Sequence, residues 1–307
     1  MPSPRPPRIA LGPDEPPAWM RDAVIAGGGH VVPIDQADAL IWADPSNPRT
    51  LEAALDDAPQ IRWVQLPHAG VEHFAHLLTD ERIWTCGKGA YAEPVAELAL
   101  GLMLAGLRSI AGYARASSWS GESGRNLLSA RVSILGGGGI ATNLVRLLQP
   151  FDCHVTVVRR QAQAMPGVDE VLEADRYFDA LPDADVVVLA LPLVPETDGI
   201  MSRNEFEAMR PHAWVVNVAR GRHVVTDDLV WALTEGTIGG AALDVTDPEP
   251  LPDDHPLWSL PNCIITPHVG NTDEMGIPLL GARITRNVAA WAHGDPLEGL
   301  VDPELGF

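Results

Sequence analysis

The sequence contains few positive charges and almost no lysine. Of its 307 residues, 21 are Lys or Arg and 41 are Asp or Glu, so the formal net charge is -20, and Lys88 is the only lysine. A protein that binds nucleic acid needs a basic face that displaces counterions from the phosphates, and an anionic membrane surface makes the same demand. We therefore expect neither a nucleic acid nor a membrane as a partner.

Cysteines and long apolar runs are scarce as well. Cys86, Cys153 and Cys263 lie far apart and form no C-x-x-C motif, so the sequence predicts neither a disulfide framework nor a metal site. No apolar run approaches the roughly 20 residues that a transmembrane helix needs. The proline-rich segment 1–7 lacks the apolar core of a secretory signal. We expect a cytoplasmic protein.

The rest of the composition is typical of a folded protein. Apolar residues make up 46% of the chain and charged residues 20%, which is enough apolar material to bury a sizeable core. A length of 307 residues corresponds to about two domains at roughly 100–200 residues each.

Short apolar segments alternate with helical patterns in two series. In the first series, strands are predicted at 8–11, 31–32, 39–42 and 61–66, and helices at 17–26 and 49–57. In the second, strands are predicted at 132–135, 154–158, 185–190, 213–218, 238–243 and 264–266, and helices at 140–148, 203–209 and 226–234. Longer helices are expected from Pro94, as the first helical residue, and from Asp273 to His293, and a loop over 117–129. This alternation predicts an α/β protein with parallel sheets covered by helices on both faces.

A glycine-rich turn joins the first strand and helix of the second series. The segment Gly136-Gly137-Gly138-Gly139-Ile140-Ala141 fits the pattern G-x-G-x-x-A. The first glycine permits a tight turn, the second lets the backbone approach a pyrophosphate, and the small third residue lets the helix pack on the strand. The free N–H groups at the start of the helix then bind phosphate. We expect Gly136, Gly138, Gly139 and Ile140 to bind a dinucleotide; the alternative is a merely flexible loop.

Two arginines stand where an NAD site usually has an acid. An Asp or Glu about 20 residues beyond the turn binds the ribose 2′-hydroxyl in NAD sites, but Arg159 and Arg160 occupy that strand end. Guanidinium groups suit a 2′-phosphate, which they bind through charge-assisted hydrogen bonds. The sequence therefore favours NADP, with NAD as the other possibility. The alternative is a pair of solvated loop arginines.

Three later strands lead to polar residues. The first ends in Arg220, and the segments that follow the other two carry Glu249 and His268. Ligands of open α/β sheets bind outside the carboxyl ends of the strands, so these side chains are expected near the cofactor. Reduction of a 2-oxo acid needs a proton on the carbonyl oxygen, which His can supply near neutral pH, and a carboxylate can orient the imidazole. Arg can bind the substrate carboxylate and polarise the carbonyl. Taken singly, each residue also fits a structural or surface role.

These segments together resemble the D-isomer-specific 2-hydroxyacid dehydrogenases, a family that includes glyoxylate/hydroxypyruvate reductases, D-lactate dehydrogenases and phosphoglycerate dehydrogenase. The likeness covers nearly the whole chain. It rests on the glycine-rich turn and on four further motifs, Leu191-Pro192-Leu193-Val194-Pro195-Glu196-Thr197, Asn217-Val218-Ala219-Arg220-Gly221, Leu243-Asp244-Val245 with Glu249-Pro250-Leu251, and Thr266-Pro267-His268.

The resemblance implies a role for each matched residue. Arg220 would bind the substrate, His268 would be the acid/base and Glu249 its carboxylate partner, which makes these three the expected catalytic residues. The backbone N–H groups of Ala69 and Gly70 would hold the substrate carboxylate. Asp244 would lie near the nicotinamide, and the remaining expected cofactor contacts are Leu191, Pro192, Thr197 and Ala219.

The resemblance also implies an architecture. It consists of two Rossmann- or flavodoxin-like doubly wound domains with the active site in the cleft between them. Residues 1–97 and 283–307 would form a discontinuous substrate domain, and residues 98–282 the NAD(P)-binding domain. The long helices would be the crossovers, and the cofactor domain would form a homodimer.

The sequence departs from the family pattern in four places. Ala141 replaces the third glycine, Arg159-Arg160 replace the acid, Tyr91 stands where many relatives have Asn, and the segment 86–89 has the unusual sequence Cys-Gly-Lys-Gly. The prediction is an NADPH-preferring reductase that makes a D-2-hydroxy acid from a small 2-oxo acid and runs in reverse. The alternatives are a phosphite dehydrogenase-like enzyme, which uses a similar Arg, Glu and His set, and a corepressor-like protein that senses dinucleotides.

Overall fold

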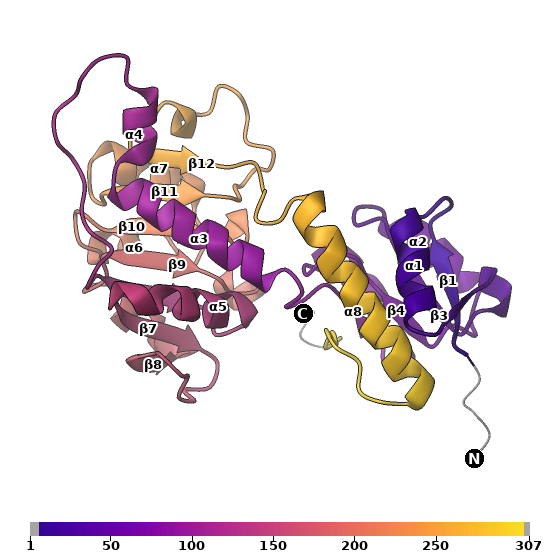
Figure 1. The fold of residues 1–307 in the computed structure, drawn as a ribbon. Helices are drawn as coiled ribbons and strands as arrows, with labels where there is room; N and C mark the ends of the chain where they lie inside the picture. The colour runs from indigo at the N-terminus through magenta and orange to yellow at the C-terminus, as the bar shows by residue number, and fades with distance from the viewer. Residues whose placement is uncertain (1–5, 304–307) are drawn as a thin grey trace. The chain divides into compact units, whose positions relative to one another are not determined.

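The computed structural model describes residues 6–303, and the chain divides into two compact units (Figure 1). Unit 1 comprises the residues up to Tyr91 and those from Thr272 onward, and unit 2 is Ala92–Asn271. The boundaries expected from the sequence, 97/98 and 282/283, fall inside helices α3 (Ala92–Leu107) and α8 (Asp273–His293). Each helix belongs as a whole to one unit, because it packs as a single element against that unit's sheet.

Unit 1 is a five-stranded parallel sheet with helices on both faces. Its strands are β1 (Arg8–Gly12), β2 (His30–Val31), β3 (Ala39–Trp42), β4 (Trp63–Gln65) and β5 (Ile83–Thr85), in the order β2-β1-β3-β4-β5. Helices α1 (Ala18–Ala26) and α8 pack on one face, where Val24, Ile284 and Val288 contact Ile9 and Ile41. Helix α2 (Pro48–Asp56) packs on the other, where its apolar side contacts β3 and β4.

Unit 2 is a seven-stranded parallel sheet. Its strands are β6 (Arg131–Leu135), β7 (His154–Arg159), β8 (Glu170–Glu173), β9 (Val186–Leu189), β10 (Trp214–Asn217), β11 (Gly240–Leu243) and β12 (Cys263–Ile265), in the order β12-β11-β10-β9-β6-β7-β8. The central strands are apolar on both faces because helices cover both. Parallel strands bring their carboxyl ends to one edge. From β6 the chain first adds strands on one side (β7, β8) and then on the other (β9 to β12), and such folds bind ligands at this switch point between β6 and β9.

The helices of unit 2 form one layer on each face of the sheet (Figure 1). Helices α3 and α5 (Gly139–Leu148) pack together over Ile134, Val157 and Val188. Helices α6 (Arg203–Ala208) and α7 (Thr226–Thr234) cover the opposite face. Helix α4 (Ile110–Arg115) follows α3. The described residues also contain short 3-10 helices at Ile34–Gln36, Glu72–Leu77, Gln149–Phe151, Ala174–Ala180, Pro195–Thr197, Gly221–His223 and Pro256–Trp258.

The predicted fold class of two doubly wound parallel sheets is confirmed, while two strands were missed and several element bounds differ. Strands β5 and β8 were not predicted, because β5 is very short and β8, at the sheet edge, has only two apolar residues between two Glu residues. Helix α3 begins at Ala92, so Pro94 is its third residue rather than its first. Proline is compatible with both positions, since the N–H groups of the first turn have no partner within the helix. Within residues 6–303, no helix is both long and apolar enough to cross a membrane.

Candidate active site

The glycine-rich turn between β6 and α5 has the geometry of a phosphate site. Gly136 has a φ of +121°, and a Cβ there would lie 2.2 Å from the carbonyl oxygen of Ala190, so only glycine fits. Gly138 precedes α5 and has open space where a Cβ would point, and no side chain caps the helix. Gly139 and Ile140 are its first two residues. The unsatisfied N–H groups of this helix start are thus accessible to an anion.

Arg159 lies against this turn. It is the last residue of β7, and a Cβ on Gly137 would lie 2.7 Å from Cβ and 3.1 Å from Nε of Arg159. The arginine side chain therefore packs across the face of Gly137, and only glycine permits this approach. Arg160 follows and is exposed. The structure thus places a guanidinium group beside the turn predicted to hold the cofactor phosphates.

The loop after β9 carries Leu191, Pro192 and Thr197. The Thr197 hydroxyl donates to the carbonyl oxygen of Pro192 at 2.8 Å and accepts the Val194 N–H at 2.9 Å. Thr197 therefore holds its own loop in shape, while Leu191 and Pro192 remain partly or fully exposed at the carboxyl edge of the sheet.

Arg220 follows β10, and its backbone is held by a buried asparagine. The side-chain oxygen of Asn217 accepts the Ala219 N–H at 3.0 Å, and its nitrogen donates to the carbonyl oxygen of Arg220 at 2.8 Å. One guanidinium nitrogen of Arg220, Nη1, donates to the carbonyl oxygen of Ala219 at 2.7 Å. This contact with a backbone carbonyl fixes one end of the guanidinium group.

Asp244 organises the loop that carries His268. The Asp244 carboxylate is buried and accepts the Thr266 hydroxyl at 2.6 Å and the N–H groups of Val269 and Gly270 at 2.9 Å. His268 has a φ of +52°, a left-handed conformation that costs about 1–3 kcal/mol for a residue other than glycine. Its N–H donates to the carbonyl oxygen of Asp244 at 2.8 Å, so these contacts hold the strained turn.

Glu249 and His268 form a close pair. Oε1 of Glu249 lies 2.6 Å from Nδ1 of His268, and Oε2 accepts the Thr246 N–H at 3.3 Å. The side chains of His268 and Glu249 are 52% and 41% exposed. With Nδ1 bonded to the carboxylate, Nε2 is the ring nitrogen that can exchange a proton with a bound molecule.

The segment carrying Arg220 packs directly on the segment that leads to Glu249. A Cβ on Gly221 would lie 1.9 Å from the carbonyl oxygen of Thr246 and 2.6 Å from the nitrogen of Asp247. Only glycine permits this backbone contact. The loops after β10, β11 and β12 are thus joined into one assembly that bears the three predicted catalytic residues.

Ala69 and Gly70 belong to unit 1, where they follow β4. The segment 86–91 supports their loop: the Gly87 N–H donates to the carbonyl oxygen of His68 at 2.9 Å, and the Tyr91 hydroxyl to that of Pro67 at 2.8 Å. Burial raises the pKa of Tyr91 to about 12, so this hydroxyl remains a donor. Tyr91, one of the departures from the family pattern, therefore buttresses the predicted substrate loop.

The same segment is anchored to α8 by a buried arginine. Arg283 is 6% exposed, and its Nη1 donates to the carbonyl oxygens of Cys86 at 3.3 Å and Lys88 at 3.1 Å. Its Nε lies 2.9 Å from a carboxylate oxygen of Glu298. Arg283 was not predicted from the sequence, because an arginine inside an amphipathic helix carries no signal of its distant partners.

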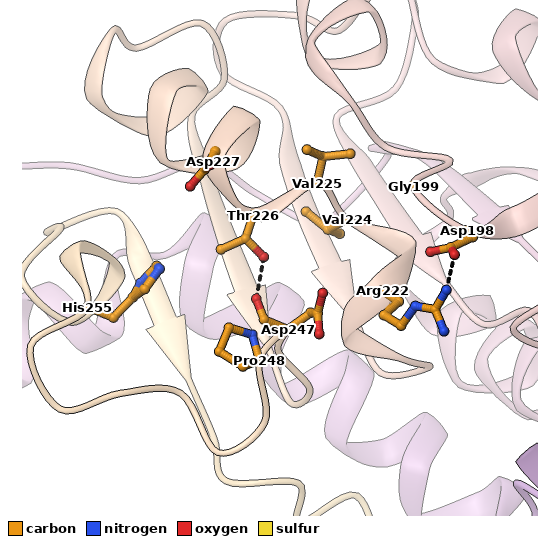
Figure 2. Close-up of a pocket in the computed structure, with 10 residues that line it drawn as sticks. All are labelled: Asp198, Gly199, Arg222, Val224, Val225, Thr226, Asp227, Asp247, Pro248 and His255. Atoms are coloured by element: carbon orange, nitrogen blue, oxygen red, sulfur yellow. Dashed lines mark hydrogen bonds and ion pairs between the residues drawn. The ribbon is translucent and has the colours of Figure 1, made fainter. Parts of the chain in front are cut away.

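A pocket of about 390 Å³ lies next to these loops in unit 2 (Figure 2). Arg222 and Asp198 form an ion pair on its wall, and the Thr226 hydroxyl donates to the carbonyl oxygen of Asp247 at 2.6 Å. The other lining residues are Gly199, Val224, Val225, Asp227, Pro248 and His255. None of the residues predicted to act in catalysis lines this pocket. Within residues 6–303, no group of three or more His, Cys, Asp or Glu side chains could hold a metal ion.

Comparison with known proteins identifies the family. Residues 100–270 match the model of the D-isomer specific 2-hydroxyacid dehydrogenase NAD binding domain. An uncharacterized protein of Corynebacterium melassecola is 39% identical over 295 residues, which cover 93% of this chain and 95% of that protein.

Two solved structures are similar over nearly the whole chain. A D-isomer specific 2-hydroxyacid dehydrogenase from Xanthobacter autotrophicus, in complex with NADPH and MES, has a TM-score of 0.83 and 25% identity, covering 98% of this chain and 100% of that one. The NADPH-dependent glyoxylate/hydroxypyruvate reductase of Sinorhizobium meliloti, in complex with NADP and sulfate, has a TM-score of 0.81 and 26% identity over the same shares. The chain therefore belongs to the D-isomer-specific 2-hydroxyacid dehydrogenases, a family of NAD(P)-dependent oxidoreductases.

Proposed function

We propose that the protein reduces a small 2-oxo acid to the D-2-hydroxy acid with NADPH, and catalyses the reverse oxidation. The observation that carries this proposal is the 2.6 Å contact between Glu249 and His268, on loops that join the Arg220 segment at the carboxyl edge of the sheet. The substrate class is supported by the Sinorhizobium meliloti relative, which is named a glyoxylate/hydroxypyruvate reductase.

The residues around the glycine-rich turn fit NADP. The open position at Gly138 and the uncapped start of α5, with Gly139 and Ile140, would bind the pyrophosphate. Arg159, packed across Gly137, and Arg160 would bind the 2′-phosphate. The further expected contacts are Gly136, Leu191, Pro192, Thr197, Ala219 and Asp244. When bound, the nicotinamide supplies the hydride for the carbonyl carbon.

The side chains of the site provide the remaining chemistry. The Arg220 guanidinium group would bind the substrate carboxylate and polarise the neighbouring carbonyl. His268 donates the proton from Nε2 to the carbonyl oxygen, and Glu249 holds Nδ1–H and stabilises the charged imidazolium. The amides of Ala69 and Gly70 stay predicted ligands of the carboxylate. The homodimer and the cytoplasmic location also stay predictions.

A substrate panel tests the proposal. Purified protein is mixed with glyoxylate, hydroxypyruvate, pyruvate or phenylpyruvate and with NADPH or NADH, and the loss of reduced-nicotinamide absorbance is followed. We expect turnover with NADPH to exceed that with NADH. Faster turnover with NADH would preserve the reaction and contradict the cofactor assignment. Cofactor binding without turnover of any acid would favour a dinucleotide-sensing binding protein instead.

His268→Ala tests the acid/base assignment. Loss of the proton donor should lower kcat by about 100-fold or more, while the Kd for NADPH changes little. The matched control is His154→Ala, because His154 lies at the amino end of β7, away from the proposed site. Equal losses in kcat and in NADPH affinity for His268→Ala would contradict the assigned role.

A further inference from the structure

The buried side chain of His223 has no role in the proposed reaction, but it contacts two segments of the candidate site. His223 lies three residues after Arg220, in a short 3-10 helix, and its side chain is fully buried. Neutral imidazole has one donor and one acceptor nitrogen, so a buried histidine needs a partner for each. The contacts of both nitrogens are found within unit 2.

The first nitrogen contacts the backbone of Arg220. Nδ1 of His223 lies 3.2 Å from the backbone nitrogen of Arg220 and 3.0 Å from its carbonyl oxygen. That carbonyl oxygen already accepts two hydrogen bonds, from the side chain of Asn217 at 2.8 Å and from the backbone N–H of His223 at 3.3 Å, and a carbonyl oxygen has two lone pairs. The Arg220 N–H is therefore the partner that needs Nδ1, and Nδ1 is the acceptor. This assigns the imidazole proton to Nε2.

The second nitrogen reaches the loop after β9. Nε2 of His223 lies 3.2 Å from the carbonyl oxygen of Pro192 and can donate its proton to it. The same oxygen accepts the Thr197 hydroxyl at 2.8 Å. His223 thus joins the segment that carries Arg220 to the loop predicted to contact the cofactor, across a separation of 31 residues in sequence.

From these contacts we propose that His223 is a positioning residue, which as a neutral Nε2–H imidazole holds the Arg220 backbone against the Pro192 loop and so sets where the guanidinium group meets the substrate carboxylate. This inference rests on the proposed reduction of a 2-oxo acid. Two further facts agree with it. Burial lowers the pKa of His223, which keeps the ring neutral near pH 7. Asn217 and His223 together account for both the carbonyl oxygen and the N–H of Arg220.

Three substitutions separate the two hydrogen bonds. The oxygen of His223→Asn can replace Nδ1 and accept the Arg220 N–H, but the side chain does not extend to Pro192. The longer His223→Gln can donate to Pro192 but offers no acceptor at the Nδ1 position. His223→Leu fills the space and makes neither bond. The matched control is His212→Leu, because His212 precedes β10, at the opposite end of the strand, and pairs with Asp185 at 2.7 Å.

The measurement is steady-state reduction of the best 2-oxo acid, with separate KM and kcat values and the Kd for NADPH. We expect the KM for the acid to rise about 10-fold or more in His223→Leu, which corresponds to one lost hydrogen bond of roughly 1.4 kcal/mol. His223→Gln should lie close to His223→Leu, and His223→Asn should recover most of the wild-type KM. The Kd for NADPH should stay within about threefold. His212→Leu should lower Tm and leave KM within about twofold.

Two failures are distinguishable. If the wild type reduces 2-oxo acids but His223→Leu keeps the wild-type KM, or His223→Asn is no better than His223→Leu, the positioning role is wrong and the proposed function stands. If the wild type reduces no 2-oxo acid, the proposed function is wrong and the positioning role is refuted with it. Should His223→Leu not fold, the comparison of His223→Asn with His223→Gln decides the question alone.

Discussion

Gly221→Ala would press one added methyl group against the backbone of a neighbouring loop, and the structure predicts a large effect from it. The new Cβ would lie 1.9 Å from the carbonyl oxygen of Thr246, whereas carbon and oxygen in contact stay about 3.3 Å apart. The obstacle is backbone, so no side chain can rotate away. Either the Arg220 segment or the Thr246–Asp247 backbone must shift by about 1.4 Å to reach that contact distance.

Such a shift separates groups that must act together. Arg220 precedes Gly221 directly, and Glu249 follows Asp247 by two residues. A misplacement of about 1 Å can lower a rate about 100-fold, or roughly 2.7 kcal/mol of transition-state stabilisation. We expect kcat/KM for the 2-oxo acid to fall by about that factor, and the free energy of unfolding by about 1–3 kcal/mol from overpacking.

The assay compares kcat/KM, the Kd for NADPH and Tm between wild type and Gly221→Ala. The matched control is Gly101→Ala in α3, where a Cβ meets nothing within 4 Å. That substitution should keep kcat/KM and raise stability by up to about 1 kcal/mol, because alanine favours the helix. A Gly221→Ala enzyme with kcat/KM within about threefold of wild type would refute the view that this backbone contact aligns the site.

Three further perturbations test other parts of the structure. Arg159→Asp should turn the cofactor preference toward NADH, since it removes a cation beside Gly137 and adds an acceptor for a 2′-hydroxyl; an unchanged NADPH/NADH ratio of kcat/KM would remove Arg159 from this role. Arg283→Met should lower the unfolding free energy by about 2 kcal/mol in chemical denaturation, because the carbonyl oxygens of Cys86 and Lys88 lose a charged donor. Its control Arg286→Met removes an exposed pair with Glu298 worth at most about 1 kcal/mol, so equal losses for the two variants would contradict the anchoring role. Because the pKa of His223 is lowered in the folded protein, the free energy of unfolding should fall as the pH drops below about 6.5. Below that pH the unfolded chain binds a proton at this histidine that the folded chain does not bind. His223→Leu should remove that part of the pH dependence, measured as unfolding free energy at pH 7.5 and pH 5.5; an unchanged slope would contradict it.

The regular elements were largely predictable from local patterns. Predicted ranges for β3, α7 and α8 coincide with the observed ones, because these segments have clear apolar patterns and clear ends. Strands β5 and β8 were missed. The three residues of β5 are too few for a pattern, and β8 is an edge strand with an exposed Glu at each end and only two apolar residues between them. The start of α3 was placed two residues late, because proline is compatible with several positions of a first helical turn.

The supporting residues of the site were not predictable in the same way. His223 and Arg283 are single polar residues whose partners are distant in sequence, up to 197 positions for Arg283 and Cys86. A period of two or of 3.6 residues carries no information about such pairs. For Asp244, the resemblance to the family implied a place near the nicotinamide, and the structure adds that its carboxylate holds the loop of His268.

The sequence by itself determined the fold class, the glycine-rich turn and the end-of-strand positions of Arg220, Glu249 and His268. It could do so because apolar periodicity sets which segments are strands, and parallel strands gather their carboxyl ends at one edge. The resemblance to the family already implied that Glu249 is the partner of His268. Only the tertiary structure decided that Gly221 packs on the backbone of Thr246 and that His223 joins Arg220 to Pro192. These contacts depend on the order of the strands and on how the loops pack. Local sequence patterns do not set either one, and a hydrogen bond forms only when packing brings donor and acceptor to about 3 Å in good alignment.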